Sequence, residues 1–223
     1  MIVVKHKKIG DISYVSHIDT MRILQRAVRR TGLKVNYSGG YNPHMELYPT
    51  HPLPLGIQSV AEYLMVGADG ISADDFLELY NKNAPRGLVG TEAIELAAKP
   101  KLVASVNVIE YSLDIGRALD KSIENIADDK DYHIEYTRKG EVVRKNTYGK
   151  VFYIKTDGGI LTAGVGTGEN SIRIDALFKK IADESGIYVC LNDIMRVNQY
   201  IYDGKEYVNA DIYLKECKKG LRR

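Results

Sequence analysis

The sequence predicts an α+β fold made of two ferredoxin-like (βαββαβ) modules with antiparallel sheets. The first reason is that segments of strand-forming composition and segments of helical periodicity follow one another as β-α-β-β-α-β in residues 1–100. The second is that residues 101–223 broadly repeat this order and end in a basic tail. The third is composition, because 44% apolar and 27% charged residues are typical of a globular chain. We therefore expect two domains, 1–100 and 101–223.

Capping residues and apolar periodicity place the elements of the first module. Ser16 is a good N-cap and apolar residues recur at helical spacing after it, so a helix is expected from there to Gly32. A second helix is expected from Ser72 to about Lys82. The segment 39–59 holds four of the six prolines and is expected to be a long Gly/Pro loop. Strands are expected where β-forming residues cluster, at 2–9, 33–38, 61–66 and 88–96.

The elements of the second module follow from the same patterns, with weaker periodicity. A hairpin is expected around Lys139-Gly140, and helices are expected at 118–126 and 175–184. Strands are expected at 102–115, 133–138, 142–146, 150–156, 160–165, 187–191 and 195–202.

Charge is distributed unevenly along a chain whose net charge is only +2. Residues 1–34 carry eight lysines and arginines against two aspartates, and the tail 215–223 carries five against one glutamate. Basic ends of this kind suggest a surface for a polyanion, although an ordinary solvated face and a frayed tail would give the same pattern. Two distant cysteines and the lack of a long apolar run favour a cytoplasmic protein with no membrane segment.

Four arginines fall on one side of the first predicted helix. They are spaced i, i+4, i+7 and i+8, which stacks them along the helix at Arg22, Arg26, Arg29 and Arg30. Guanidinium groups bind phosphate oxygens well, so this row is a candidate nucleic-acid contact. The alternative is an exposed face that pairs with acidic side chains from elsewhere.

The loop that follows concentrates residues with special backbone and stacking properties. Gly39 and Gly40 permit a tight turn, and Asn42 precedes a proline. Tyr37 and Tyr41 offer aromatic faces on which unpaired bases could stack, and together with Asn42 they complete the candidate nucleic-acid site. A rigid loop whose tyrosines pack on the sheet is the alternative.

His17 and His44 are the candidate catalytic residues, because histidine is the usual acid–base residue at neutral pH. Ser16, Asp19 and Glu62 could support them by orienting the rings. Two histidines without fixed local spacing are a weak metal signal, so neither a metal nor a cofactor is predicted. Each histidine could instead serve a structural role, by donating to a backbone carbonyl or bracing the loop.

An ordered string of motifs in the first 62 residues resembles the radical-SAM-associated protein family of unknown function. The motifs are Ser16-His-Ile-Asp19, Arg22, Arg26, Arg29-Arg30, Tyr37-Ser38, Gly40-Tyr-Asn-Pro-His44, Pro52-Leu-Pro-Leu-Gly56 and Ser59 to Glu62. Met45 stands where that family usually has proline, and Tyr41 replaces phenylalanine. The resemblance implies an accessory to a radical-SAM enzyme on a separate chain, presenting RNA or another substrate.

Three functions therefore remain open from the sequence. The first is an accessory protein that binds RNA or presents a substrate through a basic, tyrosine-bearing cleft. The second is a metal-independent RNA-processing enzyme that uses the histidine pair. The third is a protein–protein docking module without nucleic acid, in which the loop side chains Leu47, Leu53, Leu55 and Ile57 would be exposed.

Overall fold

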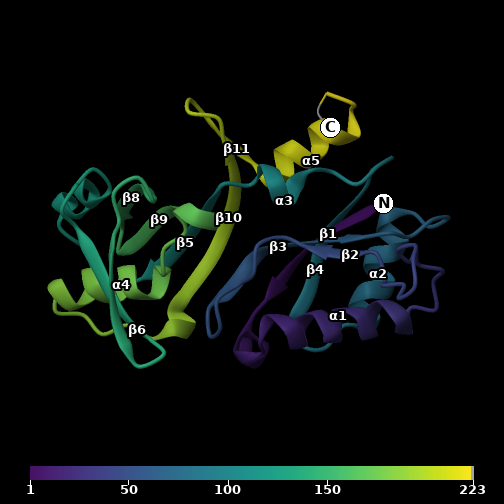
Figure 1. Cartoon of the computed structure of the whole chain (residues 1–223), viewed down its shortest axis with the longest axis horizontal. Coiled ribbons are helices and arrows are strands. Elements are labelled where there is room, and N and C mark those ends of the chain that lie inside the picture. The colour runs from purple at the N-terminus through teal and green to yellow at the C-terminus, as the bar shows by residue number, and fades with distance from the viewer. Residues whose placement is uncertain (222–223) are drawn as a thin grey trace. The chain divides into compact units, whose positions relative to one another are not determined.

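The computed structural model describes residues 1–221 and shows a mixed α+β protein whose strands pair in antiparallel fashion (Figure 1). The contacts divide the chain into two compact units, of which the second is Val106–Tyr207. The first unit contains Met1–Ser105 together with the segment that begins at Val208. The C-terminal helix thus belongs to the first unit, which differs from the domain 101–223 expected from the sequence. No helix among residues 1–221 is long and apolar enough to cross a bilayer.

The first unit is an antiparallel sheet with its strands in the order β4-β1-β3-β2. The strands are β1 (Ile2–Lys8), β2 (Leu47–Pro49), β3 (Gln58–Val66) and β4 (Leu88–Glu95). Helix α1 (His17–Arg30) follows β1, and α2 (Ala73–Asn83) follows β3. The element order β-α-β-β-α-β expected for this part of the chain is therefore present, although the second strand is not where it was expected.

The two faces of this sheet are covered by different helices, because successive side chains of a strand point to opposite faces. From β1, Ile2 and Val4 join the core under α1 and α2, where Leu24 and Phe76 are buried against them. The opposite face carries Lys5 of β1, which meets helix α5 (Ala210–Lys218). Figure 1 shows α5 on the side of the sheet away from α1.

Helices α1 and α2 begin at the serines that the sequence indicated. The Asp19 N–H donates to Ser16 Oγ (3.2 Å), and the Asp75 N–H donates to Ser72 Oγ (3.2 Å). Helix α1 ends where Gly32 takes a left-handed conformation at φ 72°, which glycine adopts at little cost.

The strand expected at 33–38 is absent, and the expectation of a continuous loop at 39–59 is wrong. The segment 33–38 forms only two isolated bridges, Val35 to Ala68 and Tyr37 to Met45, and β2 lies within the expected loop. The physical reason for β2 is burial, because Met45 and Leu47 are enclosed in the core. The two glycines that follow Ser38 disfavour an extended strand at the end of the segment 33–38.

The second unit has the strand order β10-β5-β9-β8. These strands are β5 (Val108–Asp114), β8 (Val151–Asp157), β9 (Ile160–Gly166) and β10 (Ile194–Tyr202). Helix α4 (Ile174–Glu184) lies between β9 and β10 in the chain, and β11 (Tyr207–Asn209) follows β10. Numbered along the chain, the four strands of each sheet stand in the same order, 4-1-3-2, so the two units share one sheet topology.

The expected hairpin around Lys139-Gly140 is confirmed as a separate two-stranded sheet of β6 (His133–Arg138) and β7 (Glu141–Asn146). Its two turn residues both have positive φ, at 51° and 85°, as a type I′ turn requires.

Of three other expectations for the second half, two are confirmed only in part and one is wrong. The segment 102–115 begins with a short helix, α3 (Leu102–Ser105), before β5. The segment 118–126 is a 3₁₀ helix at Lys121–Ala127, whose start is capped by Asp120. The strand expected at 187–191 is absent, since the chain there leads into a 3₁₀ turn that Asp193 closes by accepting from the Cys190 N–H.

Candidate functional site

The exposed side of α1 is an arginine face. Thr20, Leu24, Ala27 and Val28 bury the opposite side of the helix. All four arginines of the predicted row are exposed, and the period of the helix puts them on one side: Arg22, Arg26, Arg29 and Arg30. At 1.5 Å per residue the row is about 12 Å long.

Only the first arginine of this face has a described carboxylate partner. Arg22 Nη1 lies 2.9 Å from Asp19 Oδ1, and Asp19 also accepts from the Ser16 hydroxyl at 2.8 Å. The hydrogen bond from Ser16 and then the one from Arg22 lower the pKa of the Asp19 carboxyl. Within residues 1–221, no carboxylate lies within 4 Å of Arg26, Arg29 or Arg30. Ser16 and Asp19 therefore cap the start of α1 and hold Arg22 in place. Arg26, Arg29 and Arg30 are available to a ligand.

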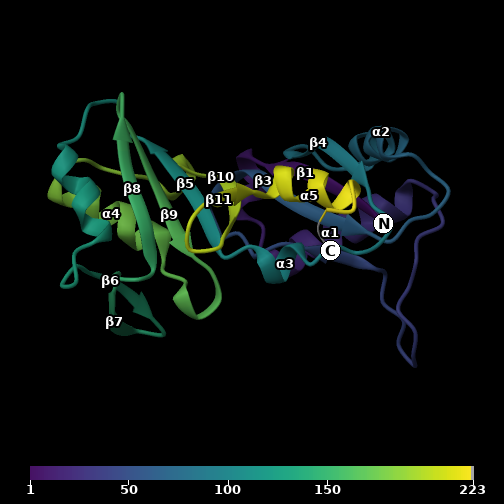
Figure 2. The same ribbon diagram turned by 90° about the horizontal axis from the view of Figure 1, so that it is seen from above.

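The loop after α1 is closed at its base and projects its tip into solvent. The Ser38 N–H donates to the His44 carbonyl (2.8 Å), and the His44 N–H donates to Ser38 Oγ (2.9 Å). Gly40 lies between them at φ 113°. Tyr41 is fully exposed and Tyr37 is 47% exposed. Figure 2 shows the loop jutting from the first unit. The exposure of Tyr41 means that its ring does not pack on the sheet, whereas Tyr37 is half-buried.

The loop does not bring its histidine to His17. A narrow cavity of about 20 Å³ lies beside the start of α1, and its lining includes His6, His17, His51 and Glu62. His44 is exposed and does not line this cavity. The histidines that the structure brings together are therefore a different set from the predicted pair, and the cavity has room for about one water molecule rather than a substrate.

His6 is the buried member of this histidine cavity. It stands opposite Glu62 in the β1–β3 register and is 3% exposed. Burial lowers its pKa to about 4, against the opposing effect of the Glu62 carboxylate. His6 is thus neutral at pH 7, and among the described residues no group of three histidine, cysteine, aspartate or glutamate side chains could hold a metal ion.

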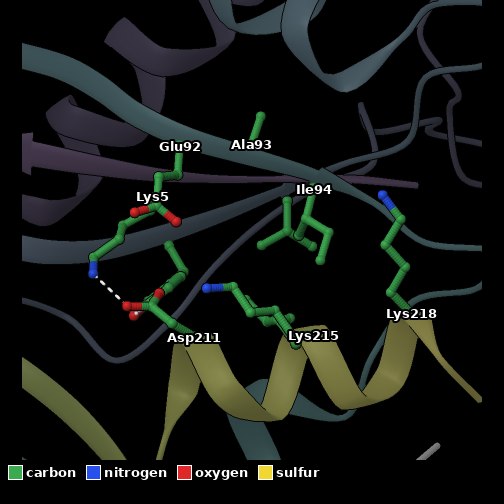
Figure 3. A pocket seen from close by; sticks show the side chains of 10 residues that line it. Lys5, Glu92, Ala93, Ile94, Asp211, Lys215 and Lys218 are labelled. Atoms are coloured by element: carbon green, nitrogen blue, oxygen red, sulfur yellow. Dashed lines mark hydrogen bonds and ion pairs between the residues drawn. The ribbon is translucent and has the colours of Figure 1, made fainter.

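A larger pocket lies on the other face of the sheet, between β1, β4 and α5 (Figure 3). We call it the α5 pocket, and its volume is about 270 Å³. The apolar side chains Val3, Ile94 and Leu214 line it, whereas Ala93 contributes only backbone, because its side chain packs in the core under α1 and α2. Polar and charged side chains complete it, namely Lys5, Tyr63, Glu92, Asp211, Lys215 and Lys218.

One end of the α5 pocket is fixed by an ion pair. Lys5 Nζ lies 2.5 Å from Asp211 Oδ2, and the Tyr63 hydroxyl donates to Asp211 Oδ1 at 2.7 Å. Burial, and then the neighbouring Asp211 carboxylate, raise the pKa of the Tyr63 hydroxyl well above its usual range. Asp211 itself lies in the first turn of α5, where its N–H donates to the Asn209 cap (2.8 Å).

Sequence reasoning pointed to the tail as basic but missed this pocket. The partners Lys5 and Asp211 are 206 positions apart, and no local pattern shows that they meet. His6 was also missed, and the only signal for it was its place on the same face of β1 as Ile2 and Val4.

Comparison with known proteins places this chain in a bacterial family. The family described as "Uncharacterized protein conserved in bacteria (DUF2344)" matches residues 1–180, and the chain belongs to it. The matched part contains the arginine face, the loop and the histidine cavity, but not α5.

Comparisons with curated proteins and with solved structures identify no further relative that bears on function. A search of curated proteins found no match to the sequence. Among solved structures, one chain of the "Crystal Structure of a Cbf5-Nop10-Gar1 Complex" is similar, with 12% identity and a TM-score of 0.43. That alignment covers 98% of this chain and 56% of the other, so this chain spans a little over half of that chain's length.

Proposed function

We propose that this protein binds single-stranded RNA through the arginine face of α1 and the loop that follows this helix. We call this loop, residues 37–44, the tyrosine loop. The observation that carries the proposal is that Arg26, Arg29 and Arg30 are exposed on one side of one helix, with no carboxylate within 4 Å among residues 1–221. Guanidinium groups that have no carboxylate partner can bind phosphates without first breaking an ion pair.

The length of the arginine face suits a short stretch of backbone. The row from Arg22 to Arg30 covers about 12 Å along α1, which corresponds to the axial rise of three to four nucleotides at about 3.4 Å each. The three arginines without a carboxylate partner occupy the second half of this row, about 6 Å. If three phosphates are neutralised, the slope of log K against log salt should be about −2 for a single strand. Affinity should then fall roughly 20-fold between 50 and 200 mM salt.

The loop supports an unpaired rather than a duplex ligand. Tyr41 presents its whole ring to solvent and Tyr37 about half of its surface, with Asn42 exposed between Tyr41 and a proline. A base stacked on an exposed ring contributes about 1–3 kcal/mol, and only an unpaired base can reach such a ring.

The partner in this proposal is a radical-SAM enzyme on a separate chain, for which this protein would act as an accessory that presents RNA. The support for the partner is the motif resemblance described above. The chain has only two cysteines, so the three-cysteine ligation of a radical-SAM cluster would have to come from the partner. In the same proposal each unit is a variant of the ferredoxin-like arrangement, supported by the shared 4-1-3-2 strand order.

The structure gives less support to the two alternatives. A ribonuclease built on His17 and His44 lacks a shared cavity, since His44 does not line the cavity beside His17. A docking surface built on the loop's apolar residues would need them exposed, yet Leu47, Leu53 and Ile57 are buried and only Leu55 is exposed.

Fluorescence anisotropy with a labelled single-stranded RNA tests the proposal. The variant replaces Arg26, Arg29 and Arg30 with glutamine. The matched control makes the same change in net charge on the β6–β7 hairpin, at the exposed residues Arg138, Lys139 and Arg144.

The arginine variant should bind at least tenfold more weakly than wild type at 100 mM salt, and the hairpin variant should stay within about twofold. Equal binding by wild type and both variants would contradict the proposal, as would equal losses in the two variants. A duplex of the same sequence should bind less tightly than the single strand, because its bases cannot reach Tyr41.

A further inference from the structure

We propose that a small apolar patch at the start of α1 holds a second unpaired base of the RNA. We call it the Tyr14 patch, and its members are Tyr14, Ile18 and Leu55, which are 58%, 65% and 58% exposed. This inference rests on the proposed RNA binding by the arginine face, and it extends that binding site beyond the first arginine of the row.

The members of the Tyr14 patch come from three segments at one end of the first unit. The 3₁₀ turn Gly10–Tyr14 supplies the tyrosine, and Ile18 lies in the first turn of α1. Leu55 comes from the loop before β3, which is joined to the 3₁₀ turn because the Gly56 N–H donates to the Ser13 carbonyl (3.0 Å). Apolar side chains scattered singly on a surface need no explanation, but three that gather at one place indicate a binding surface.

The backbone that carries Tyr14 is held in place by side chains of the sheet. Lys8 of β1 is buried, and its Nζ donates to the Val15 carbonyl (2.8 Å). The Gly10 N–H donates to Gln58 Oε1 of β3 (2.8 Å). The segment is therefore fixed at both ends, so the tyrosine remains on the surface and a base that stacks on it does not have to order the backbone first.

The Tyr14 patch continues the arginine face toward the start of the helix. Ile18 precedes Arg22 by four residues and Arg26 by eight, so the three side chains lie along one side of α1. The tyrosine loop follows the other end of α1, after Arg30. From Ile18 to Arg30 the helix rises about 18 Å, which is the axial rise of about five nucleotides at about 3.4 Å each. A strand of about six nucleotides can therefore reach both ends of this face.

The charges near the patch favour contact with a base rather than with a phosphate. Arg22, the first arginine of the row, is already paired with Asp19 (2.9 Å). Asp11 is exposed in the same 3₁₀ turn as Tyr14 and repels phosphates. The phosphates are therefore bound by the unpaired arginines in the other half of the row, and the tyrosine ring is left to an unpaired base.

The size of the Tyr14 patch suits a base better than a second protein. A stable protein–protein interface buries about 800 Å² on each partner, from about 20–30 residues a side. The patch consists of three apolar side chains, whereas a stacked base needs only one aromatic ring. We therefore assign the patch to the RNA.

Fluorescence anisotropy with two strand lengths tests the second base. The probes are labelled oligouridines of four and eight nucleotides. The shorter strand should occupy the half of the face with the unpaired arginines, whereas the longer strand also reaches Tyr14. Loss of one stacked base weakens binding roughly 5- to 150-fold. Tyr14→Ala should therefore weaken the longer strand at least fivefold and leave the shorter strand within about twofold of wild type.

Two variants are matched controls for this change. Tyr14→Phe keeps the ring and should bind both strands as wild type does. Tyr188→Ala removes a tyrosine that is 88% exposed in the second unit, and both strands should stay within about twofold of wild type. Because stacking neutralises no phosphate, the slope of log K against log salt should be the same in Tyr14→Ala as in wild type, in contrast to the arginine variant.

A spectroscopic measurement locates the base directly. The chain contains no tryptophan, so Tyr14→Trp introduces a single indole whose fluorescence is quenched when a base stacks on it. The eight-nucleotide strand should quench this fluorescence and the four-nucleotide strand should not. Tyr188→Trp is the control and should show no quenching with either strand. This measurement decides the matter even if Tyr14→Ala does not fold, as judged by circular dichroism.

Three results would overturn the inference and leave RNA binding by the arginine face in place. They are equal affinity of wild type and Tyr14→Ala for the longer strand, equal losses for the two strands in Tyr14→Ala, and no quenching in Tyr14→Trp by the longer strand. Full binding by the variant with glutamine at Arg26, Arg29 and Arg30 would instead contradict the proposed function, and this inference with it.

Discussion

Acidification should destabilise the first unit through His6, and replacing this residue should remove the effect. Burial holds the pKa of His6 at about 4 in the folded protein, whereas an exposed histidine titrates near 6.5. The unfolded chain therefore takes up a proton as pH falls through 6.5 and the folded protein does not. The contribution of His6 to stability is complete above about pH 7 and is lost as pH falls toward 4.

The size of the effect follows from the two pKa values. The loss in free energy of unfolding from His6 alone is about 2 kcal/mol at pH 5 and about 3 kcal/mol at pH 4. The charged groups that act on this ring are Glu62, which raises its pKa, and Lys8, which lowers it, while the uncharged Tyr80 ring lies 6.2 Å away. These neighbours remain in the variant, so the difference between the two proteins isolates the histidine.

The assay is urea unfolding of wild type and His6→Leu at pH 7, 6, 5 and 4, followed by circular dichroism. Leucine has a similar volume, and His6 Nδ1 has no hydrogen-bond partner among the described residues, so the cost at pH 7 should be below about 1.5 kcal/mol. Wild type should lose about 2 kcal/mol more than the variant between pH 7 and pH 5. Parallel pH profiles for the two proteins would refute the burial of a neutral His6.

Three further predictions concern the α5 ion pair and the second sheet. Asp211→Asn should cost about 1–3 kcal/mol, because it leaves the largely buried Lys5 without its carboxylate, and hydrogen exchange should then be faster in α5 than in α1. Above pH 10 the unfolded chain loses the Tyr63 proton while the folded protein keeps it, because the pKa of the buried hydroxyl is raised, so wild type should lose about 1.4 kcal/mol of stability per pH unit through this group. Tyr63→Phe should not show this loss, and equal alkaline losses of the two proteins in urea titrations would contradict the prediction. Gly164→Ala should cost about 1–3 kcal/mol, since a Cβ there would lie 2.4 Å from the Tyr153 ring, and a double-mutant cycle should show a smaller cost in a Tyr153→Leu background.

The local elements of the first unit could be predicted because each carries its own signal. Ser16 and Ser72 are the N-caps of their helices, and each side chain accepts a hydrogen bond from the backbone N–H three residues later. The spacing of the apolar residues determines which side of α1 is buried. The side that bears the arginines then follows, because helical period alone determines it. Strand β2 could not be predicted, since Leu47 and its neighbours are selected by burial against β3 rather than by a local pattern.

The parts of the site that depend on distant contacts were not predictable. His6 meets Glu62 only through the register of two strands, and no sequence pattern fixes that register. The expected meeting of His17 with His44 assumed that the loop folds back to the start of α1, whereas His44 is held by Ser38 at the base of the projecting loop. The tail was recognised as basic, but its helix closes a pocket only because Asp211 reaches Lys5.

The salt dependence of RNA binding tests the central claim most directly. Dissociation constants for a labelled single-stranded RNA are measured from 50 to 300 mM salt for wild type and for the variant with glutamine at Arg26, Arg29 and Arg30. A slope of about −2 is expected for wild type, falling to between about −0.5 and 0 in the variant. The same slope in both proteins would contradict RNA binding by the arginine face, because the phosphates would then be bound elsewhere on the molecule.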